Sequence, residues 1–383
     1  MSVPVEYRRR GQAVWMDSIS DRMITSGKLK GWIDAGTVYG VTSNPTIFGQ
    51  AIERNEGDYG AFLARRAAEG ADSFTLYDEL TRHDIARGAD LFAAQHRADP
   101  VDGWISLEVL PSLAHEEEAT VKEATRLSSL LRRPNVFIKV PATPPGVAAF
   151  RRLIGNGISV NVTLMFNRRH YRDVAMAFIA GLSDLAAKGG DLSKAHSVAS
   201  FFVSRVDTLV DKLLDERIAK AAGPEKAKLE EMKGKAGLAN SRVVYQDYLA
   251  IFHGPEFRAL AAKGARVQRP LWASTGTKNP AYSDLLYVEN LIGPETVNTM
   301  PEKTLAALLG HGRCPGDTVL VGVDEARRHL DDLKEVGIDV EAVGEKLQSD
   351  GVILFASSYD DLLAVIERRR AEAVRGVKAG VTG

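Results

Sequence analysis

Residues 135–143 read Asn-Val-Phe-Ile-Lys-Val-Pro-Ala-Thr, a short apolar run with a lysine near its end. The run is bounded by Pro134 and Pro141, and its length and β-branched content are typical of a buried strand. Successive side chains of a strand point to opposite faces, so Lys139 shares a face with Phe137. Burial favours the neutral form of an amine, which can attack a carbonyl group. The alternative is a lysine whose stem carries its charge out to solvent; the other strands decide between the two.

Strand-like and helix-like segments alternate along the whole chain. Strands are expected at 14–19, 39–44, 104–110, 136–140, 157–165, 197–203 and 270–275. For the eighth we prefer 296–300 to 318–321, because Pro301 and a helical run follow it. Helices are expected between the strands, with two in 57–99 and several in 204–268.

This alternation predicts an α/β fold of parallel strands, a (β/α)8 TIM barrel with additional helices. A doubly wound open sheet is the alternative, but the glycine fingerprint expected at its first strand–helix turn is missing. We expect residues 1–383 to form a single barrel domain. C-terminal helices at about 302–375 would pack on it, and 376–383 would be a loose tail.

Composition excludes several classes of protein. The formal net charge is −1, which gives no reason to expect a nucleic acid or an anionic membrane as partner. Cys314 is the single cysteine, so an intrachain disulfide is impossible. The N-terminal arginines are followed by a polar stretch, so no signal peptide is expected, and no apolar run of about 18 residues is present to span a bilayer. We expect a cytoplasmic location.

Period-two alternation places polar side chains on one face of most strands. Asp17 shares a face with Trp15, and Glu108 shares one with Ser106. The other positions assigned to this face are Thr42, Asn44, Asn161, Thr163, Ser200 with Phe202, and Ser274 with Trp272. The opposite faces are apolar, with Leu164 among their residues, and are suited to packing on helices.

In a barrel the polar faces converge at the carboxyl ends of the strands, so Asp17, Glu108 and Lys139 would meet in one pocket. A single buried polar group is usually a satisfied core residue, but three ionisable groups are costly unless they pair or react. A lysine with two carboxylates, and no zinc-type His/Cys spacing, suits Schiff-base carbon–carbon chemistry. Thr163 could hold a water for the carboxylates. Arg205 and Lys278 are candidates to bind a phosphate, or are exposed loop charges.

Seven segments together resemble the transaldolase family, in particular its longer bacterial members within the class I Schiff-base aldolases. The segments are residues 14–18 (VWMDS), 40–48 (GVTSNPTIF), 105–110 (ISLEVL), 136–141 (VFIKVP), 158–166 (ISVNVTLMF), 199–207 (ASFFVSRVD) and 272–280 (WASTGTKNP). Each motif alone is weak, but seven in order are specific.

The resemblance implies a barrel enzyme that carries a dihydroxyacetone unit on a lysine. The unit moves from sedoheptulose 7-phosphate to glyceraldehyde 3-phosphate, which gives erythrose 4-phosphate and fructose 6-phosphate in the non-oxidative pentose phosphate pathway. Small sugar phosphates are then the partners, without nucleic acid, membrane, metal or cofactor. A monomer or a homodimer is expected.

Roles carry over by motif. The resemblance makes Lys139 the Schiff-base residue and Asp17 the general acid/base. Glu108 and Thr163 would position a catalytic water. The remaining matches imply that Asn44 and Asn161 bind donor hydroxyls, Ser200 with Arg205 holds phosphate, and Phe202 lines the pocket. The family's best-known pattern has an arginine two residues after the serine at Ser274, where this chain has Gly276. Lys278 is the nearest cation.

Three other functions compete with this interpretation. A fructose 6-phosphate aldolase resembles a shorter chain with glutamine in place of Glu108 and a tyrosine in proton transfer, so Glu108 and Phe202 argue against it. A phosphosugar isomerase would use Glu108 as a base without an imine. A barrel kept for binding alone would need neither the lysine nor the carboxylates.

Overall fold

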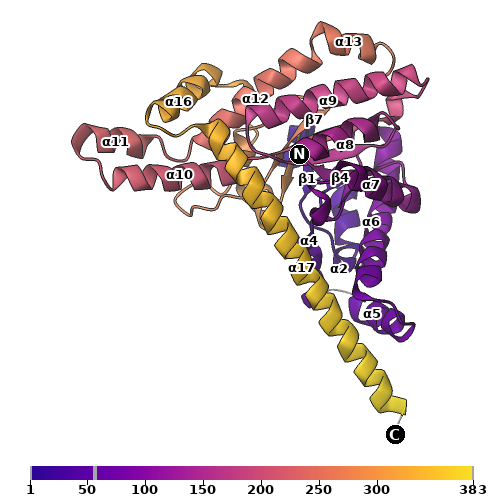
Figure 1. The fold of residues 1–383 in the computed structure, drawn as a ribbon. Helices are drawn as coiled ribbons and strands as arrows, with labels where there is room; N and C mark the ends of the chain where they lie inside the picture. The colour runs from indigo at the N-terminus through magenta and orange to yellow at the C-terminus, as the bar shows by residue number, and fades with distance from the viewer. Residues whose placement is uncertain (1, 55–57, 382–383) are drawn as a thin grey trace.

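The computed structural model describes residues 2–54 and 58–381, and its centre is a closed barrel of eight parallel strands in sequence order (Figure 1). The strands are β1 (Gln12–Met16), β2 (Gly40–Val41), β3 (Trp104–Glu108), β4 (Val136–Pro141), β5 (Val160–Met165), β6 (Ser197–Phe202), β7 (Arg269–Ala273) and β8 (Thr296–Met300). Pairing of β8 with β1 closes the barrel. The predicted (β/α)8 barrel is therefore confirmed, and so is the choice of the eighth strand, because residues 318–320 form a 3-10 turn.

Helices surround the barrel. After α1 (Val3–Arg9), they are α2 (Asp21–Thr25), α3 (Lys28–Asp34), α4 (Pro45–Glu53), α5 (Tyr59–Ala68), α6 (Ser73–Ala98), α7 (Glu117–Leu131), α8 (Pro144–Ile154), α9 (Arg168–Ala187), α10 (Ser204–Ile218), α11 (Gly223–Glu231), α12 (Ala236–Phe252), α13 (Pro255–Ala261) and α14 (Leu286–Glu289). The two helices expected in 57–99 are α5 and α6; residue 57 lies outside the described residues. The helices expected in 204–268 are α10 to α13.

Side-chain caps fix several strand–helix turns at the carboxyl ends of the strands. Asn44, Thr143 and Asn167 each accept a hydrogen bond from a backbone N–H in the first turn of α4, α8 and α9. Such caps satisfy backbone donors that a helix leaves free at its start. The loops that carry the pocket residues are consequently short and held in place.

The interior of the barrel is filled by aromatic side chains at mid-height. Trp104 stacks on Phe137 with ring centroids 3.9 Å apart and planes 14° apart, and Trp15 lies 6.3 Å from Phe137. All three side chains are almost completely buried. At this level the barrel is therefore a packed core and not a pore.

The predicted face of Leu164 is wrong. Its backbone has φ 62°, and the register of β5 on β6 shifts between Val162 and Met165. The turn carries the Leu164 side chain into the apolar cluster that contains Trp15 and Phe137, where it lies against Gly351 of the long C-terminal helix. A positive φ in a bulky apolar residue is uncommon, and the alternation rule does not anticipate it.

The predicted face of Trp272 is also wrong. Trp272 lies outside the barrel, edge-on to Phe201 at 6.2 Å, and Leu271 and Ala273 take the inner positions of β7. Ser274 still reaches the interior, because its backbone turns at φ 55° just after the strand ends.

The C-terminal segment is helical, as predicted, and comprises α15 (Glu302–His311), α16 (Val323–Glu335) and α17 (Val340–Val381). The long helix α17 packs against α4, α5, α6 and α10, and its last part extends past the rest of the chain (Figure 1). The loose tail predicted from residue 376 is wrong up to Val381, because single glycines cost a helix only about 1 kcal/mol each. Residues 382–383 lie outside the described residues, and the single-domain assignment stays a prediction. None of the described helices is long and apolar enough to cross a bilayer.

Candidate active site

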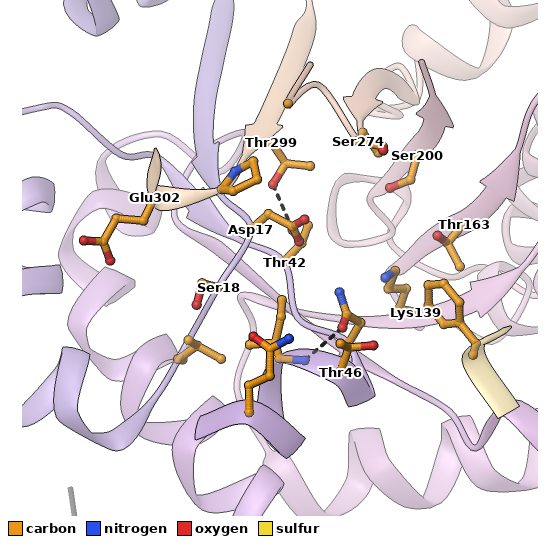
Figure 2. A pocket seen from close by; sticks show the side chains of 18 of the residues that line it. Asp17, Ser18, Thr42, Thr46, Lys139, Thr163, Ser200, Ser274, Thr299 and Glu302 are labelled. Carbon is orange, nitrogen blue, oxygen red and sulfur yellow. Dashed lines mark hydrogen bonds between the residues drawn. The ribbon is translucent and has the colours of Figure 1, made fainter. Parts of the chain in front are cut away.

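A cavity of about 560 Å³ opens at the carboxyl ends of the strands. Figure 2 shows Asp17, Lys139, Thr163, Ser200 and Ser274 reaching it from different strand ends. Of the residues predicted from sequence, those in its lining are Asp17, Asn44, Lys139, Thr163, Ser200, Phe202, Arg205, Ser274 and Lys278. Glu108 and Asn161 lie behind this lining.

Lys139 and Glu108 form a buried pair. The parallel register of β3 and β4 sets the two residues side by side, and Lys139 Nζ donates to Glu108 Oε2 at 3.2 Å and to the Ser43 carbonyl at 3.2 Å. Only 5% of Lys139 and 8% of Glu108 are exposed. Burial raises the pKa of Glu108, an effect that Lys139 opposes and Asp17 reinforces. The pair therefore offers an amine to the cavity beside a carboxyl group that holds its proton more readily than usual.

Asp17 lies one residue beyond β1 and is half-buried. Its Oδ1 accepts a hydrogen bond of 2.7 Å from the Thr42 hydroxyl, which is also 2.8 Å from the Thr299 hydroxyl. These contacts hold the carboxylate at the cavity wall and leave Oδ2 for a ligand. The sequence analysis missed Thr299, although period-two alternation from Val297, inside the barrel, would have found it.

Asn161, Ser200 and Ser106 are joined across three strands. The Ser200 hydroxyl donates to Asn161 Oδ1 at 2.7 Å, and Asn161 Nδ2 donates to Ser106 Oγ at 3.1 Å. Asn161 is completely buried, so these bonds hold the Ser200 side chain in place. Thr163 is buried too, yet its hydroxyl reaches the cavity without a hydrogen-bond partner among the described residues. An unpaired buried hydroxyl is costly and is well placed to bind a polar ligand.

Cations gather around this cavity. Arg205, in the first turn of α10, lies with its guanidinium carbon 5.4 Å from the Phe202 ring centre. Burial lowers the pKa of Arg205, and Asp17 opposes that shift. Lys278 is exposed at the rim. Arg54, which directly follows α4 and was not predicted from the sequence, lines the cavity as well.

Among the residues that the structure describes, the lining contains four basic residues and two acidic ones. The basic residues are Arg54, Lys139, Arg205 and Lys278, and the acidic residues are Asp17 and Glu302. An excess of positive charge in a concave site favours an anionic ligand. Ser274 lies near Arg205, held through its hydroxyl, which is 2.9 Å from the hydroxyl of Ser204.

The helix α17 contributes a wall that the sequence analysis did not assign. The ring centre of Phe355 is 5.5 Å from Lys139 Nζ, and Leu354 also lines the cavity. Gln348 anchors the helix, because its Nε2 donates to the carbonyls of Ala142 at 2.9 Å and Leu164 at 3.0 Å. No local pattern ties this helix to the strand ends, so only the tertiary structure identifies it.

Asn44 has two roles in the geometry. Its Oδ1 accepts from the backbone N–H of Ile47 at 3.1 Å and so caps α4, while the residue also lines the cavity. The cap orients the amide and leaves Nδ2 as a donor for a ligand hydroxyl.

Comparisons with known proteins agree with this geometry. Residues 14–366 match the protein family described as Transaldolase/Fructose-6-phosphate aldolase. A protein named Transaldolase from Mycobacterium tuberculosis is 45% identical over 355 residues, which cover 92% of this chain and 93% of the relative. One from Saccharopolyspora erythraea is 44% identical over 363 residues, or 95% and 96% of the two chains. Transaldolase 2 from Streptomyces avermitilis is 46% identical over 360 residues, or 94% and 95%.

Proposed function

The chain belongs to the transaldolase/fructose-6-phosphate aldolase family, and we propose on that premise which transfer reaction its cavity performs. It moves a dihydroxyacetone unit from sedoheptulose 7-phosphate to glyceraldehyde 3-phosphate and gives erythrose 4-phosphate and fructose 6-phosphate. The reaction is reversible and belongs to the non-oxidative pentose phosphate pathway. The buried lysine–carboxylate pair that opens on a basic cavity is the observation that carries the proposal.

Lys139 is the proposed nucleophile. Its neutral amine attacks the ketone carbon of the donor, and the carbinolamine loses water to become an iminium ion. Glu108, held 3.2 Å from the amine, exchanges protons during this dehydration, and its raised pKa suits a group that must both donate and accept. The unpaired hydroxyl of Thr163 holds the water that carries these protons.

Asp17 is the proposed general base and acid. It takes the proton of the donor's C4 hydroxyl, the C3–C4 bond breaks, and its electron pair moves into the iminium as the aldehyde product leaves. The resulting enamine carbon attacks the acceptor aldehyde, and Asp17 returns the proton to the new hydroxyl. Hydrolysis of the iminium releases fructose 6-phosphate. The hydrogen bond from Thr42 keeps the carboxylate aimed at the cavity through both steps.

The substrate phosphate is proposed to bind at the basic rim. Arg205 stands next to Phe202 and offers a planar set of N–H donors, and the fixed hydroxyl of Ser200 adds to them. Ser274 and Lys278 complete the rim. Lys278 supplies the positive charge that an arginine supplies in the family pattern, at the position where this chain has Gly276. Asn44 and Asn161 remain the proposed contacts of donor hydroxyls, with Asn161 acting by way of Ser200.

An assay of the complete transfer tests this proposal. Purified enzyme is mixed with sedoheptulose 7-phosphate and glyceraldehyde 3-phosphate, and both products are followed by mass spectrometry. We expect erythrose 4-phosphate and fructose 6-phosphate in equal amounts, with almost no free dihydroxyacetone. Release of free dihydroxyacetone as the main product would assign the chain to the aldolase branch of the family instead.

Sugar phosphates are the proposed partners, and a monomer or homodimer in the cytoplasm is the proposed state. Sedimentation of the purified chain would test the oligomeric state, and fractionation of the cells that make it would test the location.

A further inference from the structure

A second cavity, of about 620 Å³, lies at the opposite end of the barrel. It is enclosed by the amino ends of β3, β4, β6 and β7, by α13 and the end of α12, and by the turn before β8. Its volume falls in the range typical of small-molecule sites and exceeds that of the cavity at Lys139. The proposed transfer reaction makes no use of it.

The floor of this cavity is aromatic. Trp104 and Phe137, which stack on each other inside the barrel, form its inner end. Phe252 and Phe257 form a side wall and meet edge to face at 5.0 Å. All four rings are only 1–2% exposed, so a flat apolar group in the cavity would gain contacts with them but little new burial of their surface.

The rim of the cavity is basic. In the described part of the chain, four arginines line it, namely Arg8, Arg258, Arg266 and Arg269, and Glu295 is the single acidic residue of the lining. Arg8 is already paired with Asp99 and Asp102, and Glu295 is within 2.9 Å of His253 Nε2. Within residues 2–54 and 58–381, neither Arg258 nor Arg266 has a carboxylate at ion-pair distance. The rim therefore has spare positive charge.

Arg269 is a second, independent feature suited to an anion. It is 93% buried, and burial lowers its pKa, with Asp102 as the main opposing charge. Its guanidinium has five N–H donors, yet its contacts with the described residues are one hydrogen bond to the Val101 carbonyl and an ion pair of 3.7 Å to Asp102. The nitrogens that make no hydrogen bond to the described residues are not fully shielded from solvent, so they can donate to a ligand in the cavity.

His196 gives the wall a neutral polar group between these two regions. Its ring lies 5.0 Å from that of Trp104, and burial, reinforced by Arg266, lowers the pKa of His196 to about 4. Uncharged at neutral pH, it does not add to the cationic rim, and the imidazole can donate or accept one hydrogen bond.

We propose that this amino-end cavity binds a small aromatic anion: a ring system seated on Trp104 and Phe252, with a carboxylate, sulfonate or phosphate group between Arg266 and Arg269. The site is separate from the lysine cavity, so the proposal stands or falls independently of the transfer reaction.

Binding of 8-anilinonaphthalene-1-sulfonate to the full chain tests it, because this dye joins a ring system to one anionic group and its fluorescence reports an apolar site. We expect saturable binding of one dye per chain. Arg266→Glu removes an exposed cation from the rim, and Ala261→Trp places an indole in the cavity from the exposed end of α13. Arg266→Glu should weaken binding by about tenfold or more, the worth of one charged hydrogen bond, and Ala261→Trp should weaken it by filling the space that the ring system needs.

Arg172→Glu is the matched control, because Arg172 is an exposed arginine of α9 that lines neither cavity. It should leave dye affinity unchanged, and circular dichroism should show all three variants folded. The proposal is overturned if no saturable binding occurs, if both rim variants bind as tightly as the wild type, or if Arg172→Glu weakens binding as much as they do. Displacement of the dye by fructose 6-phosphate would also overturn it, since the dye would then occupy the lysine cavity.

Discussion

The two ends of this barrel each bury cations beside a carboxylate, but the cations differ. At the carboxyl end Lys139 meets Glu108 at 3.2 Å and faces a cavity. At the amino end Arg8 meets Asp102 at 2.6 Å, with Arg269 3.7 Å from the same carboxylate. A lysine amine can lose its proton and form a covalent bond, whereas a guanidinium stays charged and can only donate hydrogen bonds. Burial alone therefore does not identify the reactive end; the residue type does.

Replacing Lys139 should have the largest effect, and it tests whether the carboxyl end depends on an amine and not only on a positive charge. Lys139→Met removes the nucleophile, and we expect transfer activity to fall on the order of 10⁴-fold or more. Lys139→Arg keeps a cation at this place and should be equally inactive, because charge without a nucleophilic amine cannot form the imine. Initial rates of both variants measure the effect. Activity of Lys139→Arg within tenfold of the wild type would mean that the site works by charge alone.

Changing Asp17, the other carboxylate at the carboxyl end of the barrel, should have the next largest effect. Asp17→Asn keeps the contact with Thr42 but cannot take the hydroxyl proton, so kcat should fall by about 10²–10⁴-fold. Imine formation precedes that step, so borohydride should still reduce donor onto the variant. If trapping and turnover were lost together, Asp17 would act before the bond is cleaved.

The matching change at the amino end should affect stability instead of catalysis. Asp102→Asn leaves Arg269 buried without the carboxylate it pairs with, and we expect unfolding to be easier by about 3 kcal/mol. The kcat of the folded protein should not change. Urea unfolding and initial rates would measure the two quantities. A large loss of kcat with unchanged stability would mean that Asp102 serves catalysis, which contradicts a purely structural role for the amino end.

The smallest expected effects are opposite pH dependences at the two ends. Burial lowers the pKa of His196, at the amino end, to about 4. Its contribution to stability is complete above pH 6.5 and is lost as the pH falls through 4. Burial raises the pKa of Asp207, in α10 after β6, to about 6. Its contribution is complete below pH 4 and is lost as the pH rises through 6. Each amounts to about 2–3 kcal/mol.

Unfolding curves between pH 4 and 7 test the signs. Relative to His196→Gln, the wild type should lose stability toward low pH. Relative to Asp207→Asn, it should lose stability toward high pH. Parallel curves for wild type and variant would mean that the group titrates at its ordinary pKa in the folded protein.

Much of the barrel and of its mouth could be predicted because both follow local rules. Alternation of apolar and polar residues placed Asp17, Glu108 and Lys139 on inward faces. The parallel register of β3 and β4 then sets Glu108 beside Lys139. The same rule failed at Leu164, where the chain leaves the strand geometry, and at Trp272, which was placed on the face of Ser274 although the backbone turns at Ser274. At Leu164 the turned carbonyl accepts a hydrogen bond from Gln348, a residue 184 positions away.

The position of α17 could not be predicted for the same reason. The sequence predicts helices for residues 302–375, but the side on which α17 packs depends on α4 and α5. The contact of Phe355 with Lys139 is therefore a property of the tertiary structure. The amino-end cavity likewise joins Arg8, Arg269 and α13, which no local pattern connects.

Borohydride trapping tests the role of Lys139 most directly. The enzyme is incubated with fructose 6-phosphate, reduced, digested and analysed by mass spectrometry. We predict one stable three-carbon adduct, located on Lys139. A folded enzyme with no adduct, or with the adduct on a different lysine, would contradict the Schiff-base mechanism at this end of the barrel.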